Sequence, residues 1–205
     1  MKIINSIAAT SLFLALLIIF AGCDRKHQQP KPRGYFRIDL PDKQYVKLDS
    51  MRYYSFDYPV YSLITPDYHS MEEKDWVNVE FPAYKGTLHI SYKPVNDNLN
   101  KYLEDSYLMV TKHISKAAGI RDSLIIDTAR NVYGLVYFLE GEGVATPLQF
   151  YVTDSTEHFL RGSLYFNMKP NNDSLAPVIE FVTNDVKYLI NSLEWKYKQN
   201  KTLKK

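Results

Sequence analysis

The chain has 205 residues and a formal net charge of +2, so it lacks the basic excess expected of a nucleic-acid-binding protein. Its single cysteine excludes an internal disulfide, and stability must therefore come from packing. Tyrosine, which occurs 17 times, joins an apolar ring to a polar hydroxyl and is favoured at protein interfaces. We therefore expect one packed domain with protein partners and no nucleic-acid partner.

The N-terminal residues have the pattern of a secretory signal peptide. Lys2 supplies a positive charge, and the apolar stretch 7–22 is too short to span a bilayer comfortably. Phe20-Ala21-Gly22-Cys23 resembles a bacterial lipobox, in which the cysteine receives acyl chains such as palmitate and becomes the new N-terminus. The alternatives are an uncleaved single-pass membrane anchor and a cysteine that stands at this position by coincidence. We expect cleavage to remove residues 1–22 and to leave a lipidated chain of 183 residues.

The rest of the chain divides into a tether, one domain and a tail. Residues 23–34 are polar and contain prolines, which is typical of a linker. Residues 35–195 carry all the periodic apolar patterns and are predicted to form a single domain. Residues 196–205 are basic and are expected to fray.

Alternating apolar residues predict two groups of strands in the domain. Tyr35–Pro41 is a candidate strand or extended arm, and Pro59 should end or border its strand. The first group comprises 51–58, 60–65, 76–81 and 87–92, and the second comprises 123–128, 132–139, 148–153 and 158–166.

Apolar residues at three- and four-residue steps predict a helix after each group of strands. The first helix is expected over 99–117, with an N-cap within 96–98 and a C-cap at Gly119. The second is expected over 174–193, with Ser174 as its cap and Pro177 in its first turn. This order predicts an α+β fold with a largely antiparallel twisted sheet and packed helices, similar to a Mog1/PsbP-like sandwich.

No pattern of catalytic or metal-binding residues stands out. The five histidines lack the i, i+4 spacing of a zinc protease, and no Gly-x-Ser-x-Gly motif is present. Gly162 precedes Ser163 inside a predicted strand, where a glycine is expected to let a helix pack closely. We therefore expect no metal, no cofactor and no enzymatic activity.

One face of the last two predicted strands is rich in aromatic residues. Phe159, Arg161, Ser163 and Tyr165 alternate with core residues, and Gln149, Tyr151, Tyr133 and Tyr137 can join them. Aromatic rings beside an arginine have the composition of a protein-binding surface. The alternative is that a helix or loop covers this face as ordinary core. The candidate partner-binding residues are Tyr151, Phe159, Arg161 and Tyr165.

Several segments together resemble the gliding motility lipoprotein GldD family of the Bacteroidota. They are Gly34–Pro41, Phe56–Pro59, Gly86–Lys93, Gln149–Ser155 and His158–Asn167. The resemblance implies an envelope protein needed for gliding and for type IX secretion, with other envelope proteins as partners. It transfers one site only, the lipid-bearing Cys23. A non-catalytic subunit or assembly factor is the leading hypothesis, and an envelope hydrolase or a small-ligand carrier with an apolar cavity is the alternative.

The family's phylum suggests two further expectations. Surface-exposed lipoproteins there usually carry acidic residues after the cysteine, whereas Asp24–Gln28 is mostly basic or polar, so we expect a domain that faces the periplasm. Periplasmic proteins there can be O-glycosylated at Asp-Ser or Asp-Thr followed by a suitable residue. Burial is expected to exclude several of the matching hydroxyl residues, which are Ser50, Ser123, Thr128, Ser155 and Ser174.

Overall fold

The computed structural model describes residues 38–68, 70, 72–141, 143–167 and 172–197, the first three of the last range by backbone only. The signal sequence, Cys23, the tether and most of the basic tail lie outside these residues, and so does the side chain of Ser174. The predictions about lipidation, tether and tail therefore stay predictions. All the helices and strands that the structure describes belong to one compact unit, Asp39–Lys205.

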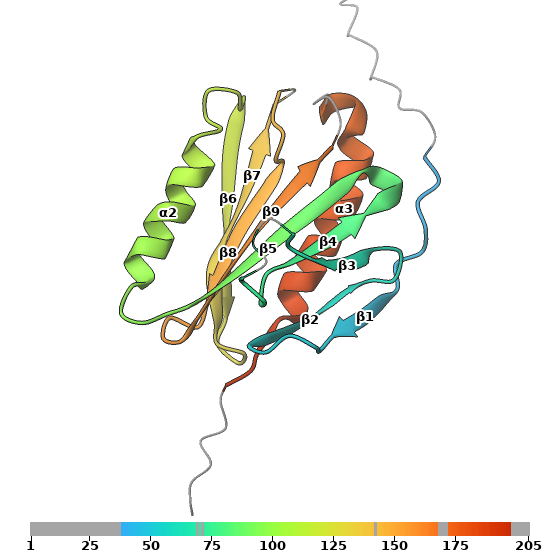
Figure 1. Cartoon of the computed structure of the whole chain (residues 1–205). Coiled ribbons are helices and arrows are strands. Elements are labelled where there is room, and N and C mark those ends of the chain that lie inside the picture. The colour runs from blue at the N-terminus through green and yellow to red at the C-terminus, as the bar shows by residue number, and fades with distance from the viewer. Residues whose placement is uncertain (1–37, 69, 71, 142, 168–171, 198–205) are drawn as a thin grey trace, which may run out of the picture. The chain divides into compact units, whose positions relative to one another are not determined.

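A seven-stranded antiparallel sheet forms the centre of this unit (Figure 1). All neighbouring strands are antiparallel. Most of them are consecutive in the chain, and β5 and β9, which are not, join the two groups of strands. In spatial order the strands are β3 (Leu63–Pro66), β4 (Val77–Phe81), β5 (Gly86–Pro94), β9 (His158–Phe166), β8 (Leu148–Thr153), β7 (Val132–Glu140) and β6 (Gly119–Asp127).

A smaller sheet of three strands accompanies the large one. It has the order β1 (Tyr45–Leu48), β2 (Tyr54–Pro59) and β10 (Glu194–Trp195), and Pro59 is the last residue of its strand, as predicted. The sequence patterns gave no sign of β1 or of β10, since four and two residues are too few to show a period. Ile38–Pro41, the described part of the expected first strand or arm, forms no strand.

Helix α3 (Asn172–Ser192) supplies the main helical contribution to the core. It begins two residues before the predicted start, so Pro177 lies inside the helix and the prediction of a first-turn position is wrong. Buried apolar residues at three- and four-residue steps form a stripe along this helix. They are Val178, Val182, Val186 and Leu189, and Leu193 continues the stripe just past the end of the helix.

Helix α2 (Leu99–Thr111) is shorter than predicted. The Asn98 side chain accepts a hydrogen bond from the Asn96 N–H rather than capping the helix. After Thr111 the backbone makes i→i−3 turns, and Gly119 begins β6 instead of ending the helix. Ile114, an apolar residue of the predicted helix, is 56% exposed, so burial of its side chain does not stabilise further helical turns there.

The core lies between the inner face of the large sheet, helix α3 and strand β2. The inner face consists of alternate residues along each strand, among them Leu88, Ile90, Leu148, Phe150, Leu160 and Leu164. Gly162 of β9 lies opposite Phe150 of the neighbouring strand β8, and a Cβ at Gly162 would lie 2.1 Å from the Phe150 ring. The space left by this glycine is therefore taken by that ring, which corrects the expectation that a helix fills it.

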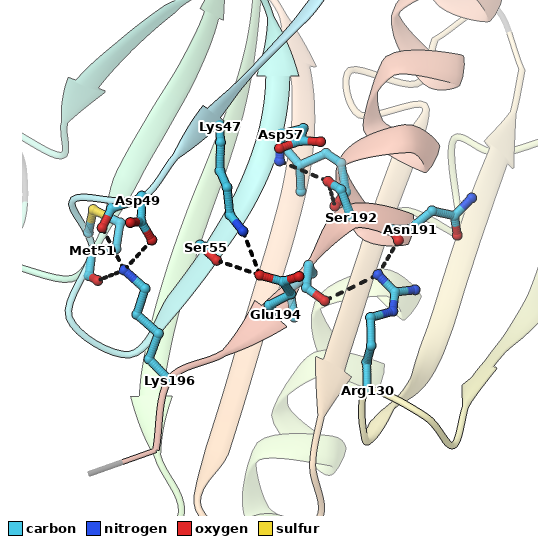
Figure 2. Close-up of polar contacts among 12 residues, drawn as sticks. Lys47, Asp49, Met51, Ser55, Asp57, Arg130, Asn191, Ser192, Glu194 and Lys196 are labelled. Carbon is cyan, nitrogen blue, oxygen red and sulfur yellow. Dashed lines mark hydrogen bonds and ion pairs between the residues drawn. The ribbon is translucent and has the colours of Figure 1, made fainter. Parts of the chain in front are cut away.

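Polar contacts fasten the C-terminal end of the described chain to the rest of the fold (Figure 2). Lys47 of β1 reaches the Glu194 carboxylate at 2.6 Å, and the Lys196 Nζ lies 2.8 Å from the Asp49 carboxylate. Arg130, in the β6–β7 turn, donates hydrogen bonds to backbone carbonyls at the end of α3. These contacts hold β10 against β2 and join α3 to the far end of the large sheet.

A buried carboxylate holds the first described residues against α3. Lys43 Nζ lies 2.7 Å from Asp185 Oδ1, and the Tyr45 hydroxyl donates to the same oxygen at 2.8 Å. The Tyr61 hydroxyl donates to the other oxygen. Burial, together with this carboxylate, raises the pKa of Tyr45 and of Tyr61. Both phenols therefore remain neutral donors that satisfy the buried charge.

Candidate functional site

The face of the large sheet opposite α3, here called the outer face, holds the aromatic residues singled out in the sequence. Strand register aligns Ser163 with Gln149 and with Tyr137, and aligns Arg161 with Tyr151. Phe159 faces Thr153, which in turn faces Tyr133. Because side chains alternate along a strand, these residues share one face, as the alternation predicted.

Helix α2 covers part of the outer face. Its Tyr102 ring lies 5.3 Å from the ring of Phe159, which also stacks on Tyr151 at 5.8 Å. Phe159 is only 3% exposed and supports the helix, which is the alternative that the sequence left open. Tyr151, Arg161 and Tyr165 are half-buried. Partner binding by these four residues stays a prediction.

A cavity of about 380 Å³ lies between α2 and strands β5 and β9, next to Trp76 at the start of β4. On this side of the cavity, α2 contributes Ser106 and Met109, whereas α3 packs valines and leucines against the opposite face of the sheet. Helix α2 therefore does not fill the space between itself and the sheet. Apolar and aromatic side chains make up much of the wall, and they are Trp76, Tyr102, Met109 and Phe159. A volume of this size is typical of a pocket for one small molecule.

Arg161 is the polar centre of the cavity wall. Its Nη2 donates to Gln149 Oε1 at 2.5 Å, and no carboxylate of the described chain forms an ion pair with it. Burial lowers the pKa of its guanidinium, which nevertheless stays charged because a free arginine titrates far above neutrality. Even half-buried, a cation without a counter-charge loses part of its hydration, and this residue therefore needs an explanation.

Two buried polar atoms beside Arg161 lack partners. The Gln149 Nε2 and the Ser163 Oγ have no hydrogen-bond partner within the described ranges, although both residues are about 2% exposed or less. Ser163 lies next to His89 of the cavity wall in the strand register, and Gln149 is bonded to Arg161. An amide N–H, a hydroxyl and a guanidinium are all donors, so this corner of the outer face offers an excess of donors.

The cavity also contains residue types that enzymes use. His89, Ser91, Ser106 and Asp105 line it, and His89 Nδ1 lies 2.8 Å from Asn78 Oδ1. In the part of the chain that the structure describes, neither serine hydroxyl is hydrogen-bonded to His89. A serine nucleophile needs such a contact with its base, so these residues do not form an assembled nucleophile–base pair.

A second feature of the outer face is its exposed margin at β6. Leu124 is 71% exposed and Ile126 is 68% exposed, and both lie in register with half-buried residues of β7. Strand β6 pairs with β7 only, among the strands that the structure describes, so its other edge has free backbone donors and acceptors. We call this margin, formed by Leu124, Ile126, Tyr133 and Leu135, the β6 surface.

The candidate glycosylation residues are more exposed than expected. Ser50, Ser123, Thr128 and Ser155 are all exposed, so burial excludes none of the four, and the expectation that it would exclude several is wrong. The fifth, Ser174, lies outside the described side chains.

Among the residues that the structure describes, no helix combines the length and the apolarity needed to cross a bilayer. Likewise, no three His, Cys, Asp or Glu side chains of the described chain lie close enough together to hold a metal ion.

Sequence reasoning found the strand side of the site and missed the helix side. Trp76 and Met109 line the cavity, and the sequence patterns singled out neither as a site residue. Trp76 comes just before its strand, and Met109 is not part of the apolar stripe of α2. The available signal was Ser106, a small polar residue at the buried centre of the helix, which is 3% exposed. A small residue at that position leaves space against the sheet, but the sequence alone does not show what lies opposite.

The fold and this face define an α+β domain with one fully packed sheet face and one face that holds a ligand-sized cavity and an exposed edge strand. Comparison with known families adds the identity. The family model described as gliding motility lipoprotein GldD matches residues 25–195. The chain belongs to the gliding motility lipoprotein GldD family, which confirms the resemblance found in its sequence. Membership makes it a lipoprotein anchored to a membrane of the cell envelope and involved in gliding motility.

Comparisons with individual proteins contribute less. No curated protein matches the chain significantly. Among solved structures, the chain is similar to the solution structure of cyanobacterial PsbP (CyanoP) from Synechocystis sp. PCC 6803, with 14% identity and a TM-score of 0.44. The match covers 78% of this chain and 98% of that one. The α+β class is confirmed by the elements themselves, and the likeness to PsbP says nothing about function.

Proposed function

We propose that this protein is a non-catalytic, lipid-anchored subunit or assembly factor of the gliding and type IX secretion machinery, and that it binds other envelope proteins from the periplasmic side. Family membership supports the link to gliding motility. The proposal extends that link to secretion, to the absence of catalysis and to the compartment.

The observation that carries the proposal is the β6 surface. Large apolar side chains that stand singly on a surface need no explanation, but Leu124 and Ile126 stand together on an open strand edge. Such an edge favours pairing with an extended segment of a partner, whose backbone completes the ladder while its side chains cover the apolar pair. We therefore assign an extended strand of an envelope protein as the partner of this surface.

The non-catalytic part of the proposal rests on the geometry of the cavity. The family supplies no catalytic residues to transfer, and the hydroxyls of Ser91 and Ser106 do not contact His89. The hydrolase alternative therefore has no specific observation in its favour. The carrier alternative does have one, since a small-ligand carrier needs an apolar cavity and this protein has it.

A crosslinking pull-down from native envelopes tests the role of the β6 surface. The variant Leu124→Glu with Ile126→Glu places two charges on it. The matched control, Val60→Glu with Leu63→Glu, places two charges at the opposite edge, where these residues are 54% and 55% exposed. We expect the first variant to lose motility and secretion components, together with gliding, and the control to keep them.

Two results would contradict this assignment. Equal recovery with both variants would remove the β6 surface from the proposal, and loss with the control alone would move the interface to β3. Circular dichroism of both variants verifies that the charges leave the fold intact. Loss of gliding with normal export of a secreted cargo would separate the two machines and restrict the proposal to gliding.

The anchor and the orientation need a separate test, because Cys23 lies outside the described residues. Cys23→Ala should abolish labelling by a palmitate analogue and release the domain from the membrane fraction. Protease added to intact cells should leave the wild-type domain uncut, whereas the same protease should cut it after the outer membrane is opened. Cutting in intact cells would place the domain on the cell surface instead.

A further inference from the structure

We propose that the cavity between α2 and the outer face of strands β5 and β9 binds a small monocarboxylic acid with an apolar body, and that Arg161 receives its carboxylate. The proposal concerns a different part of the molecule from the β6 surface and does not depend on the proposed function.

Arg161 supplies the charge that such a ligand would neutralise. It lines the cavity and makes one hydrogen bond, to Gln149 Oε1, and no carboxylate of the described chain pairs with it. A guanidinium has five N–H donors in a planar fork that matches the two oxygens of a carboxylate. One hydrogen bond leaves most of these donors for a ligand, and the missing counter-charge would arrive with it.

The unpartnered donors next to Arg161 point to the same chemistry. Gln149 Nε2 and Ser163 Oγ are buried without partners. Ser163 is paired with His89 of the cavity wall in the strand register, and Gln149 accepts a hydrogen bond from Arg161. Buried donors are nearly always satisfied, and exceptions mark places where a further group belongs. Because Gln149 is hydrogen-bonded to Arg161, a carboxylate held by Arg161 would lie next to the residues that carry these donors.

The opposite wall of the cavity selects the body of the ligand. Trp76, Tyr102, Met109 and Phe159 offer rings and a thioether, which gain free energy when they cover an apolar chain or ring. The cavity, at about 380 Å³, falls in the range of pockets for single small molecules. This volume is too small for a folded segment of a protein.

The charges around the cavity favour a single negative charge over two. Asp67 and Asp105 also line it and would repel a dianion more strongly than a monoanion. Lys93, the other cation of the wall, already lies 2.5 Å from Glu73 and over the Trp76 ring. Arg161 is therefore the cation that remains for the ligand, and a monocarboxylate matches it better than a phosphate does.

Isothermal titration with octanoate and with 3-phenylpropanoate tests the proposal, and 1-octanol serves as the uncharged comparison. We expect at least one acid to bind more tightly than the alcohol. Arg161→Gln should weaken binding of the acid by at least about tenfold, the loss expected for a charge-assisted hydrogen bond, and leave the alcohol unchanged. Arg121→Gln removes the same charge from an exposed position on β6 and should leave the affinity for the acid intact.

A second pair of variants keeps the test decisive if Arg161→Gln fails to fold. Ser106→Leu places a larger side chain inside the cavity and should abolish binding of both acid and alcohol, whereas Ser115→Leu, in the exposed turn after α2, should not. Quenching of Trp76 fluorescence would locate the ligand. Absence of binding by either acid, equal affinity for acid and alcohol, or unchanged binding by Ser106→Leu would overturn the proposal.

Discussion

The two faces of the seven-stranded sheet are covered by one helix each, and the two helices differ in how they pack. Helix α3 buries a stripe of valines and leucines against the inner face, and strand β2 adds buried aromatic rings. Helix α2 has only Ser106 and Val110 fully buried. As a result the inner face is a continuous core, whereas the outer face keeps a cavity and an exposed margin.

This difference separates the parts of the molecule that hold the fold from the parts that are available for binding. An apolar core packed as densely as the inner face has no room for a ligand and tolerates little change. The outer face has retained two buried polar atoms without partners, Gln149 Nε2 and Ser163 Oγ, which cost stability, and beside them the half-buried Arg161. Stability of the fold does not require these groups, which is why we look for the function of the protein on that face.

The largest expected effect comes from the same substitution made on each face. Leu164→Ala, on the inner face and 0% exposed, should lower the free energy of unfolding by about 3–5 kcal/mol, because it leaves a cavity in a dense core. Leu124→Ala, 71% exposed on the outer face, should change it by less than about 0.5 kcal/mol. Urea denaturation of both variants measures the difference. Similar losses would mean that the two faces do not differ as described.

A smaller effect is expected from overfilling the inner face. Gly162→Ala brings a methyl group to within 2.1 Å of the Phe150 ring and should cost about 1–3 kcal/mol. Phe150→Leu in the same chain should recover part of this loss, because the atom in the way belongs to the ring. A double-mutant cycle measures the coupling. Additive losses would show that the close contact does not limit substitution at Gly162.

Acid should weaken the inner face through His158. This residue is 2% exposed, its Nδ1 lies 2.8 Å from the Tyr92 hydroxyl, and burial lowers its pKa. The unfolded chain, with a histidine pKa of about 6.5, therefore binds the proton first, and stability falls as the pH drops below that value. The free energy of unfolding should fall by up to about 1.4 kcal/mol per pH unit, and this fall should end at the lowered pKa of His158 in the folded state.

Denaturation midpoints measured between neutral pH and pH 5, for wild type and for His158→Gln, test this expectation. The substitution should remove the slope in that window while leaving the acid transition of the carboxylates in place. A slope that persists in the variant would assign the acid sensitivity to other groups, and a flat wild-type profile would show that His158 titrates alike in both states.

The inner face could be predicted from the sequence and the outer face only in part. Alternation in 148–153 and 158–166 predicted β8 and β9 with their correct ends, because core residues in these strands repeat with a strict period. Helix α2 was predicted too long, since the period of its apolar residues says nothing about whether a surface exists to receive Ile114. The cavity depends on which residues lie opposite Ser106, and this is set by tertiary contacts between α2 and β9.

The smallest expected effect compares the two helices directly. Val182→Ala in α3 and Val110→Ala in α2 remove the same two methyl groups from residues that are 0% and 3% exposed. The first should cost about 2 kcal/mol, because transfer and cavity terms add in a dense core. The second should cost about 1 kcal/mol or less, because the cavity beside α2 lets the helix settle. Hydrogen exchange adds a local measurement: Val110→Ala should speed exchange of the α2 amides alone, since that helix opens without the core. Equal costs, or faster exchange in α3, would mean that α2 unfolds with the rest of the domain and that the outer face is as firmly built as the inner one.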